Sequence, residues 1–393
     1  MTVARKINQM MVQSSWIRKM FEEGARLKAE HGPQNVFDFS LGNPNLPPPE
    51  KFNEILRDTV DSCGLGDHCY MPQAGYPQVC GAIAEYLTRE QEVDISCDEI
   101  IMTCGAAGAL NVIFKALLDP GDEVLAPTPC FVEYRFYADN HGGVLKMVAT
   151  HPDFTLDIDA IDAAITEKTK IVLINSPNNP TGQIYHRDSL DALGRTLVQK
   201  SRAYGHPIYL VSDEPYRKIV FDGAKVPSIF KSYGESIIAT SYSKDISIPG
   251  ERIGFAAVNP AAAYRAELMA GMALANRILG FVNAPALMQR VVACMQGLHV
   301  DIGEYQRKRD ILCNGLAEAG YAFTTPRGAF YLFPQSPIDD DVAFVKALQK
   351  ELILVVPGSG FAGPGHFRIA FCVDDQTIVN ALPGFKRVMQ QYR

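Results

Sequence analysis

The stretch TSYSKDISIPGERIG, residues 240–254, decides how this chain is interpreted. It follows a short apolar run, and Lys244 comes directly after Ser243, with Ser241 two residues before that serine and Arg252 further along. Hydroxyls, small residues and an arginine fork are what a phosphate dianion needs. A lysine beside such a site can form an imine with an aldehyde once its pKa is lowered. A lysine here also suits a solvated surface, so the rest of the chain has to decide between these interpretations.

The residues around this stretch predict an α/β fold. Apolar runs without polar alternation suit strands that are buried on both faces, and helices between them suit a mostly parallel sheet lying between helices. Amphipathic segments such as 107–118 and 189–203 lie between several of these runs. The runs are found at residues 100–102, 124–126, 171–174, 208–211 and 237–239.

At 393 residues the chain is long enough for two domains. We predict an N-terminal arm with part of a small domain (1–48), a large domain (49–290) and a small α+β domain (291–393). In the first part a loose arm precedes a helix over 16–28 and a strand over 36–39. The last part is expected to follow a long helical region over 284–315. It is expected to contain strands at 330–333, 353–356 and 367–371 and a closing helix from Asp375.

Composition excludes several classes of protein. A net charge of −7 argues against a nucleic-acid surface. The nine cysteines are scattered and never form C-x-x-C, so neither a disulfide framework nor a zinc site is suggested, and no metal site is expected. A reducing cytoplasm fits best. The N-terminus lacks the apolar core of a signal peptide, and no apolar run is long enough to span a bilayer.

Ligands of open α/β sheets gather at the carboxyl ends of the strands, so the residues after each apolar run are candidates for the site. After the first run comes TCGAAG, 103–108, in which Gly105, Ala106 and Ala107 open a helix. Small residues there let backbone N–H groups approach an anion, which the helix N-terminus also favours. They equally allow close packing of the helix on the strand, so both interpretations stay open.

Two further runs end in polar motifs. NSPNNPTG, 175–182, is either a turn that redirects the chain or a rigid frame in which Asn179 donates to a ligand oxygen. SDEPY, 212–216, places Asp213 at the end of a buried strand, where a carboxylate is costly unless donors or a cation meet it. Asp213 is therefore either a helix N-cap or the partner of a protonated ring nitrogen.

Together these motifs specify a phosphate, a ring nitrogen that needs an acid, a ring oxygen that needs donors and an aldehyde that needs an amine. That ligand is pyridoxal 5′-phosphate (PLP). Over essentially its whole length the sequence resembles a fold-type I PLP enzyme of the class I/II aminotransferase family, with an aspartate-aminotransferase-like pattern. The resemblance rests on the ordered set of a glycine helix start, N-N-P-T-G, D-E-x-Y and S-x-S-K-x7-R-x-G.

The resemblance implies roles for the cofactor residues. Lys244 would hold PLP as a Schiff base and then act as the acid and base for proton transfer, with Asp213 and Tyr216 as the other catalytic residues. Asp213 would keep the ring nitrogen protonated, and Asn179 and Tyr216 would hydrogen-bond the ring oxygen. The phosphate would be held by Gly105, Ala106, Ala107, Ser241, Ser243 and Arg252. Phe131 would stack on the ring, or is ordinary core.

For the substrate, the resemblance implies that Arg368 takes the α-carboxylate in a bidentate fork, with Asn179 and the backbone N–H of Gly42 nearby. Tyr70 would reach the phosphate in a partner subunit, which implies a homodimer with shared sites; a lone exposed tyrosine is the other interpretation. For the substrate side chain, Trp16 could form a lid, and Arg18 or Arg277 could meet a distal carboxylate. Helix packing and solvated arginines explain these three residues equally well.

The expected function is a PLP-dependent aminotransferase that moves the amino group of an L-amino acid, first aspartate, to a 2-oxo acid such as 2-oxoglutarate. Fold and cofactor do not fix the reaction type, because PLP makes several bonds labile. An aminocyclopropane-carboxylate-synthase-like enzyme, a β-eliminating lyase and a non-catalytic PLP-binding regulator are the alternatives. The form of N-P-T-G at Thr181 favours the aminotransferase.

Overall fold

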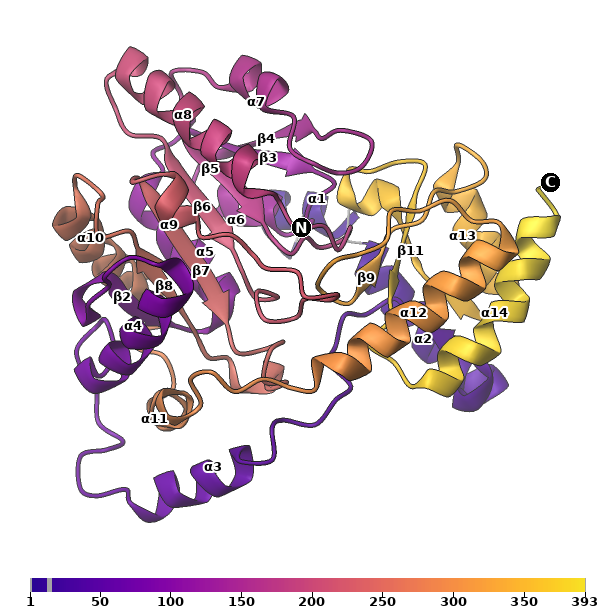
Figure 1. Cartoon of the computed structure of the whole chain (residues 1–393), viewed down its shortest axis with the longest axis horizontal. Coiled ribbons are helices and arrows are strands. Elements are labelled where there is room, and N and C mark those ends of the chain that lie inside the picture. The colour runs from indigo at the N-terminus through magenta and orange to yellow at the C-terminus, as the bar shows by residue number, and fades with distance from the viewer. Residues whose placement is uncertain (1, 13–15, 393) are drawn as a thin grey trace.

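The computed structural model describes residues 2–12 and 16–392 and contains a large sheet and two small ones (Figure 1). The helices are α1 Arg5–Val12, α2 Trp16–His31, α3 Phe52–Asp61, α4 Pro77–Gln91, α5 Gly105–Leu117, α6 Tyr134–Asn140, α7 Ile158–Ala164, α8 Arg187–Tyr204, α9 Ile229–Ser232, α10 Arg265–Ile278, α11 Ala286–Cys294, α12 Ile302–Ala319, α13 Asp341–Lys350 and α14 Asp375–Gln390. The strands are β1 Phe37–Asp38, β2 Ile100–Thr103, β3 Glu123–Thr128, β4 Val144–Ala149, β5 Thr169–Asn175, β6 Tyr209–Asp213, β7 Ser236–Ser241, β8 Gly254–Val258, β9 Tyr331–Leu332, β10 Ile353–Leu354, β11 Val356–Pro357 and β12 Phe367–Ala370. Four short 3-10 turns complete the set, η1 Pro33–Asn35, η2 Cys97–Glu99, η3 Pro249–Glu251 and η4 Gly358–Phe361.

The large sheet has seven strands in the order β2-β8-β7-β6-β5-β3-β4. The strands from β4 to β7 pair in parallel, and β8 pairs antiparallel with both β7 and β2. The predicted α/β fold with a mostly parallel sheet is therefore confirmed, and all five apolar runs lie in or overlap strands of this sheet. Because parallel neighbours point the same way, β5, β6 and β7 end at one edge.

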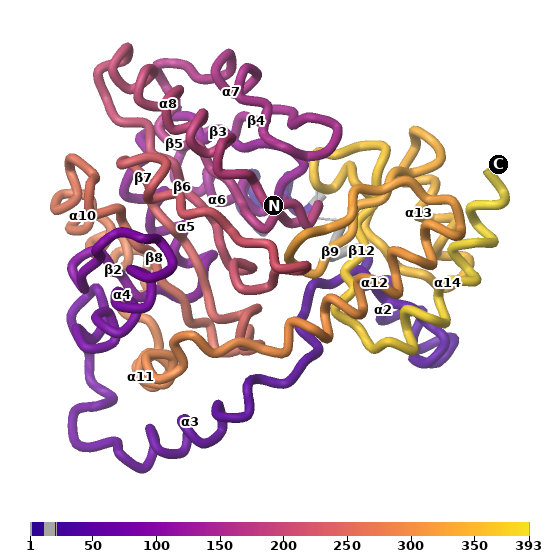
Figure 2. Tube along the Cα trace, in the orientation of Figure 1, coloured from indigo at the N-terminus to yellow at the C-terminus, as the bar shows by residue number. Residues whose placement is uncertain are grey.

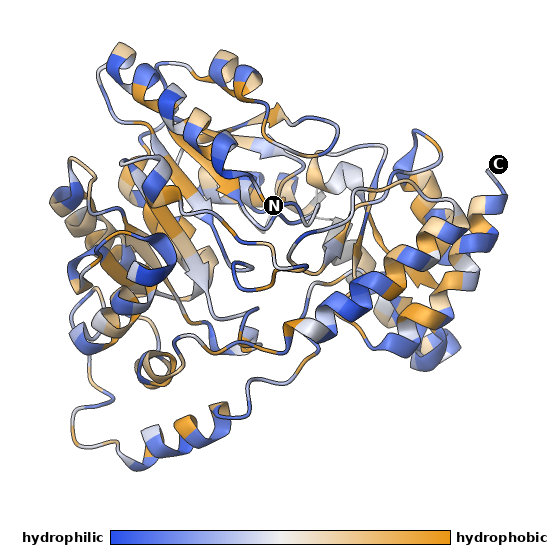
Figure 3. Ribbon diagram, in the orientation of Figure 1, coloured by the Kyte–Doolittle hydropathy of each residue, from blue (hydrophilic) through white to orange (hydrophobic). Residues whose placement is uncertain are grey.

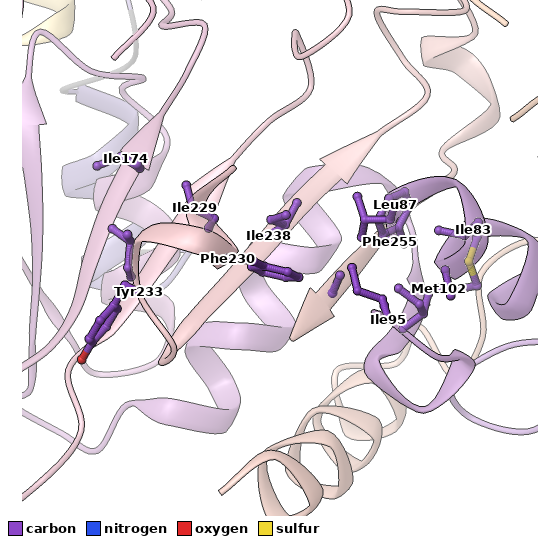
Figure 4. Close-up of a cluster of buried hydrophobic side chains, with 14 of the residues drawn as sticks. Ile83, Leu87, Ile95, Met102, Ile174, Ile229, Phe230, Tyr233, Ile238 and Phe255 are labelled. Atoms are coloured by element: carbon purple, nitrogen blue, oxygen red, sulfur yellow. The ribbon is translucent and has the colours of Figure 1, made fainter. Parts of the chain in front are cut away.

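Two hydrophobic layers cover the sheet, because successive residues of a strand point to opposite faces. Ile171 and Leu173 pack with α5 and α10, whereas Val172 and Ile174 pack with α4, α8 and α11. Figure 4 shows part of the second layer, in which Ile174 and Ile238 lie among side chains from α4 and α9. The main strands are largely hydrophobic, and the helices carry both hydrophobic and hydrophilic residues (Figure 3).

A separate hydrophobic cluster is built from both ends of the chain. The N-terminal β1 pairs in parallel with β10, and β9, β12 and β11 form a small antiparallel sheet covered by α12, α13 and α14. In Figure 2 the indigo α2 lies on the same side of the molecule as the yellow α14. This arrangement brings β12 and the segment after β1 to the same side of the molecule.

Several predicted elements were wrong in detail. The long helical region over 284–315 is two helices, because α11 ends at Cys294 and the Asp301 side chain caps a new helix by accepting from the Gly303 backbone N–H at 2.9 Å. The strand expected over 353–356 divides into β10 and β11, which pair with different strands. The loose arm before residue 16 contains α1, and α2 continues to His31.

Two strands of the large sheet were not predicted. β4 (VLKMVA) is an edge strand, so most of its residues are exposed or half-buried and its pattern is weak. β8 (GFAAV) is fully buried, but its glycine and alanines carry little strand propensity. Gly254, the first residue of β8, has no room for a side chain, because a Cβ there would lie 2.3 Å from the Thr240 carbonyl oxygen.

Candidate active site

A pocket of about 360 Å³ lies where β5, β6 and β7 end, and β12 contributes Arg368 to its wall. The structure brings most of the predicted site residues to this one pocket. The predicted residues that line it are Gly42, Ala106, Ala107, Phe131, Asn179, Asp213, Tyr216, Ser241, Ser243, Lys244, Arg252 and Arg368.

Lys244 lies in the turns that follow β7, and its side chain reaches across the pocket. Its Nζ donates to the carbonyl oxygen of Gly42 at 2.8 Å. Burial lowers the pKa of Lys244 to about 8, and the nearby charges of Arg368 and Arg252 act in the same direction. A lysine with a lowered pKa holds a larger neutral fraction near pH 7, and the neutral amine is the form that attacks a carbonyl.

Asp213 is the last residue of β6 and is buried. Its Oδ2 accepts from the Tyr134 hydroxyl at 2.6 Å, and its Oδ1 has no partner among the described residues. Burial raises the pKa of Asp213 to about 7, although the Tyr134 hydrogen bond opposes this shift. The helix N-cap interpretation is wrong, because turns follow Asp213 and the next helix begins at Ile229. A buried carboxylate oxygen without a partner can accept a hydrogen bond from a protonated nitrogen of a ligand.

The opposite end of the pocket suits an anion. α5 begins at Gly105, whose φ of +76° favours glycine, and Ala106 and Ala107 follow at the pocket wall. A Cβ on Gly105 would lie 3.0 Å from Nη2 of Arg252, so the arginine approaches the start of the helix closely. An arginine therefore lies at the start of this helix, as a site for an anion requires, and the phosphate role of the segment stays a prediction.

The arginine of β12 is held by two hydrogen bonds and two aromatic rings. Arg368 donates through Nη1 to Oδ1 of Asn179 at 3.0 Å and through Nη2 to the Ser40 carbonyl oxygen at 2.6 Å. The rings of Tyr331 and Phe361 lie against its guanidinium, with their centroids 4.7 and 4.6 Å from Cζ. Nε is buried and has no partner among the described residues, so the protein does not satisfy all the donors of this guanidinium, which can pair with a carboxylate.

Asn179 and Gly42 are fixed by the same surroundings. The backbone N–H of Asn179 donates to Oδ1 of Asn175 at 2.7 Å, and Asn175 donates in turn to the Asp213 carbonyl oxygen at 2.7 Å. With its oxygen on Arg368, Asn179 keeps its amide nitrogen as a donor toward the pocket. Gly42 has no space for a side chain, because a Cβ there would lie 2.0 Å from the hydroxyl oxygen of Tyr331.

Other predicted residues lie away from the pocket lining. Gly105 lies directly behind it, Arg277 is exposed in the last turn of α10, and Tyr70 is 90% exposed. Trp16 begins α2 and Arg18 follows in the same helix, but their side chains lie outside the described part of the structure.

Sequence reasoning missed several residues that line the pocket, above all Tyr134 and Tyr331. Tyr331 donates or accepts a 2.8 Å hydrogen bond with the hydroxyl of Tyr216. A usable signal existed, because a tyrosine in a buried strand or just after one needs a partner for its hydroxyl. Its partner lies far away in sequence, so the signal does not identify it.

The residues that the structure describes lack two features. No group of three or more histidine, cysteine, aspartate or glutamate side chains there could hold a metal ion. Within the same residues, none of the helices combines the length and apolar character that crossing a membrane requires.

Comparisons with known proteins agree on one family. A sequence profile described as aminotransferase class I and II matches residues 34–384. The aspartate/prephenate aminotransferase of Thermus thermophilus is 33% identical over 359 residues, covering 89% of this chain and 90% of that protein. A crystal structure of an amino transferase from Eubacterium rectale is 38% identical with a TM-score of 0.97 and covers 100% of both chains. Thermus thermophilus aspartate aminotransferase with maleate is 29% identical with a TM-score of 0.86, covering 99% of this chain and 100% of that chain.

Proposed function

This chain belongs to the class I and II aminotransferases and is a PLP-dependent enzyme, and we propose that Lys244 holds the cofactor and that aspartate is its amino donor. When bound, PLP supplies an aldehyde that captures amines and a ring that withdraws the electrons released at the Cα of the amino acid. One observation carries the assignment of the site: the lysine with a lowered pKa and the unpaired oxygen of Asp213 line the same pocket.

The cofactor ring would be held on several sides. Oδ1 of Asp213 would accept a hydrogen bond from the ring N–H, and Tyr134 keeps the carboxylate oriented. Asn179 and Tyr216 would donate to the ring oxygen, and Phe131 would stack on the ring. Pairing with a protonated nitrogen stabilises a buried carboxylate electrostatically, and this stabilisation offsets the cost of its burial.

The phosphate would lie at the start of α5. The backbone N–H groups of Gly105, Ala106 and Ala107 would bind it, and Ser241 and Ser243 would supply hydroxyl groups. Arg252 would neutralise its charge, since the guanidinium approaches Gly105 closely. When bound, the cofactor would bring an aldehyde within the same pocket as Lys244.

The substrate α-carboxylate would bind the guanidinium of Arg368, with the backbone N–H of Gly42 beside it. Lys244 would take up and return the Cα proton of the amino acid, because its lowered pKa suits both directions of transfer near neutral pH. Its contact with the Gly42 carbonyl holds the amine at the substrate end of the pocket.

The proposal of aspartate, with 2-oxoglutarate as acceptor, is supported by relatives such as the aspartate/prephenate aminotransferase of Thermus thermophilus and the aspartate aminotransferase of Bacillus subtilis, which is 31% identical. Lys244, Arg252 and Arg368 are the basic residues of the pocket lining, and each already has a role. The side-chain carboxylate of aspartate therefore needs a cation from outside the pocket lining. Arg18 or Arg277 is the candidate, and Trp16 would form a lid over the site.

The experiment is a half-reaction screen of all twenty amino acids, followed by 2-oxoglutarate and pyruvate as acceptors, with the cofactor spectrum as the readout. We expect aspartate to convert the spectrum fastest and 2-oxoglutarate to restore it. Lys244→Ala is expected to lose the visible band, and exposed Lys225→Ala to retain it as the control. A Lys244→Ala protein with the wild-type band and turnover contradicts the assignment. Release of ammonia and pyruvate in place of amino transfer would indicate a lyase.

We also propose a homodimer with shared active sites. Tyr70 does not line the pocket of its own chain and is 90% exposed, and Leu65 and Val60 nearby are also exposed. Contiguous exposed apolar groups indicate an interaction surface. In Figure 1 the segment around α3 reaches outward from the remainder of the molecule. The partners are then amino-acid and 2-oxo-acid substrates and a second copy of the chain, with no nucleic acid or membrane.

The domain division at residues 48 and 290 is part of the same proposal. The existence of two domains is supported by the large sheet, whose strands lie between residues 100 and 258, and by the cluster that joins β1 to β9–β12 and α12–α14. The boundary at 290 falls inside α11, whose Val291 and Val292 pack in the core of the large sheet, so the second boundary is better placed after this helix. A cytoplasmic location is supported by the cysteines, all nine of which are free thiols.

A further inference from the structure

Tyr331 contacts two parts of the site that are distant in sequence, Arg368 and Tyr216. It begins β9 and lies opposite Ala370 of β12. Arg368 lies two residues before Ala370, so Arg368 and Ala370 face the same side of the strand. The Tyr331 ring is therefore diagonal to the arginine, which explains the 4.7 Å separation between the guanidinium carbon and the ring centroid.

The ring of Tyr331 restrains the arginine. Arg368 and Tyr331 are each 2% exposed, and the Phe361 ring also lies against the guanidinium, with its centroid 4.6 Å from Cζ. Two rings thus pack against the guanidinium while hydrogen bonds hold Nη1 and Nη2. A planar fork fixed in this way loses little freedom when it pairs with a carboxylate.

The hydroxyl of Tyr331 has a different contact. Its oxygen lies 2.8 Å from the hydroxyl oxygen of Tyr216, and the two rings pack edge to face at 5.6 Å. If Tyr216 donates to a ligand in the pocket, its oxygen is left to accept from Tyr331. A hydroxyl that accepts one hydrogen bond becomes a stronger donor of the next.

We propose that Tyr331 is a positioning residue of the active site, whose hydroxyl orients and strengthens Tyr216 as a donor to the cofactor ring oxygen and whose ring fixes Arg368 for the substrate carboxylate. The inference rests on the proposed function, because it requires PLP at Lys244. It assigns separable roles to the two parts of one side chain, and the two roles are tested separately.

The hydroxyl is tested by a pH titration of the visible band of the bound cofactor. A donor on the ring oxygen favours its anionic form, so loss of the donor makes the chromophore keep its proton to higher pH. Tyr331→Phe is expected to raise the titration midpoint by roughly half a pH unit to one pH unit. Tyr216→Phe is expected to raise the midpoint as well, and the double variant is expected to match Tyr216→Phe alone, because Tyr331 acts through Tyr216.

The ring is tested by equilibrium binding of maleate, a dicarboxylate that has no amino group to transfer. Tyr331→Phe is expected to leave the Kd within about twofold, whereas Tyr331→Leu is expected to raise it by roughly fivefold or more because the stacking is lost. Tyr321→Phe is the matched control, since Tyr321 is buried in the same cluster and its hydroxyl donates to the Phe385 carbonyl oxygen. Both readouts are expected to stay unchanged in this control.

An unshifted midpoint in Tyr331→Phe, or a double variant whose shift is the sum of the two single shifts, overturns the role of the hydroxyl. Equal maleate affinity in Tyr331→Leu and Tyr331→Phe overturns the role of the ring. If Tyr331→Leu does not fold, Tyr331→Phe alone still tests the role of the hydroxyl. The role of the ring is then tested by comparing Tyr331→Trp, which keeps an aromatic face, with Tyr331→His. Tyr331→Trp is expected to bind maleate more tightly than Tyr331→His. A wild-type protein without a visible band contradicts the proposed function instead.

Discussion

The hydroxyl of Tyr134 donates to Oδ2 of Asp213 at 2.6 Å and leaves Oδ1 of the same carboxylate without a partner among the described residues. One oxygen is thus used to orient the acid and the other is available to the ligand. Because the hydrogen bond stabilises the ionised form, it opposes the rise that burial causes in the pKa of Asp213.

Tyr134→Phe is therefore expected to raise the pKa of Asp213 and weaken its hold on the ring nitrogen. A hydrogen bond to a charged group is worth about 1.5–3 kcal/mol, so we expect kcat/KM for aspartate to fall roughly tenfold to a hundredfold. The pH profile of kcat/KM is the measurement, and its acid limb is expected to move to higher pH. Tyr209→Phe, a buried tyrosine outside the pocket lining, is the control. An acid limb at the wild-type position would show that Tyr134 is only structural.

Asp213→Ala is expected to keep the cofactor but lose most of the activity. The phosphate contacts and Lys244 remain, whereas the ring nitrogen loses the acid that keeps it protonated. Loss of one preorganised charged partner predicts a fall in kcat of at least about a hundredfold. Absorbance after dialysis reports cofactor retention, and single-turnover kinetics report the chemical step. Unchanged turnover in this variant would remove Asp213 from the mechanism.

Arg368→Lys is expected to raise KM for every amino acid by a similar factor, because all share the α-carboxylate. A lysine cannot reproduce the planar fork or the packing between Tyr331 and Phe361. KM across the accepted amino acids is the measurement, with exposed Arg327→Lys as the control. An effect confined to acidic amino acids would show that Arg368 binds the side chain of the substrate instead.

The stability of the cofactor-free protein is expected to have a minimum near pH 7 to 8 from two buried groups. The folded pKa of Asp213 is raised from 3.8 to about 7, so the folded state keeps this proton to higher pH than the unfolded state does. Stability therefore falls as the pH rises from about 3.8 to about 7. The folded pKa of Lys244 is lowered from 10.5 to about 8, so the unfolded state keeps this proton to higher pH than the folded state does. Stability therefore rises as the pH increases from about 8 to about 10.5. Each limb is on the order of 3 kcal/mol.

Urea unfolding of the cofactor-free protein between pH 4 and 10 measures these limbs. Asp213→Asn is expected to remove the fall on the acid side, and Lys244→Met is expected to remove the rise on the alkaline side. The comparison uses differences from wild type, so that titration of all other groups cancels. A difference between wild type and Asp213→Asn that stays constant between pH 4 and pH 7 would contradict the buried position of this carboxylate.

Much of the fold could be predicted because the signals are local. The five apolar runs became strands since each is short, uninterrupted and bounded by turn residues. Strand β4 was missed because an edge strand needs no continuous apolar run, and β8 because it is stabilised by its two neighbours more than by its own residues. The break between α11 and α12 was missed because residues on both sides of Asp301 have a helical pattern.

The sequence by itself determined the cofactor and the residues around Lys244, because each of these residues follows a strand, and parallel strands must end at one edge of the sheet. Only the tertiary structure decided which side chains support them. Tyr134 and Asp213 are 79 residues apart, and Arg368 and Asn179 are 189 residues apart. Contacts over such separations depend on how the whole sheet and the second hydrophobic cluster pack together, and no local pattern encodes that packing. The lysine that first suggested the chemistry therefore depends on partners that the folded chain alone brings to it.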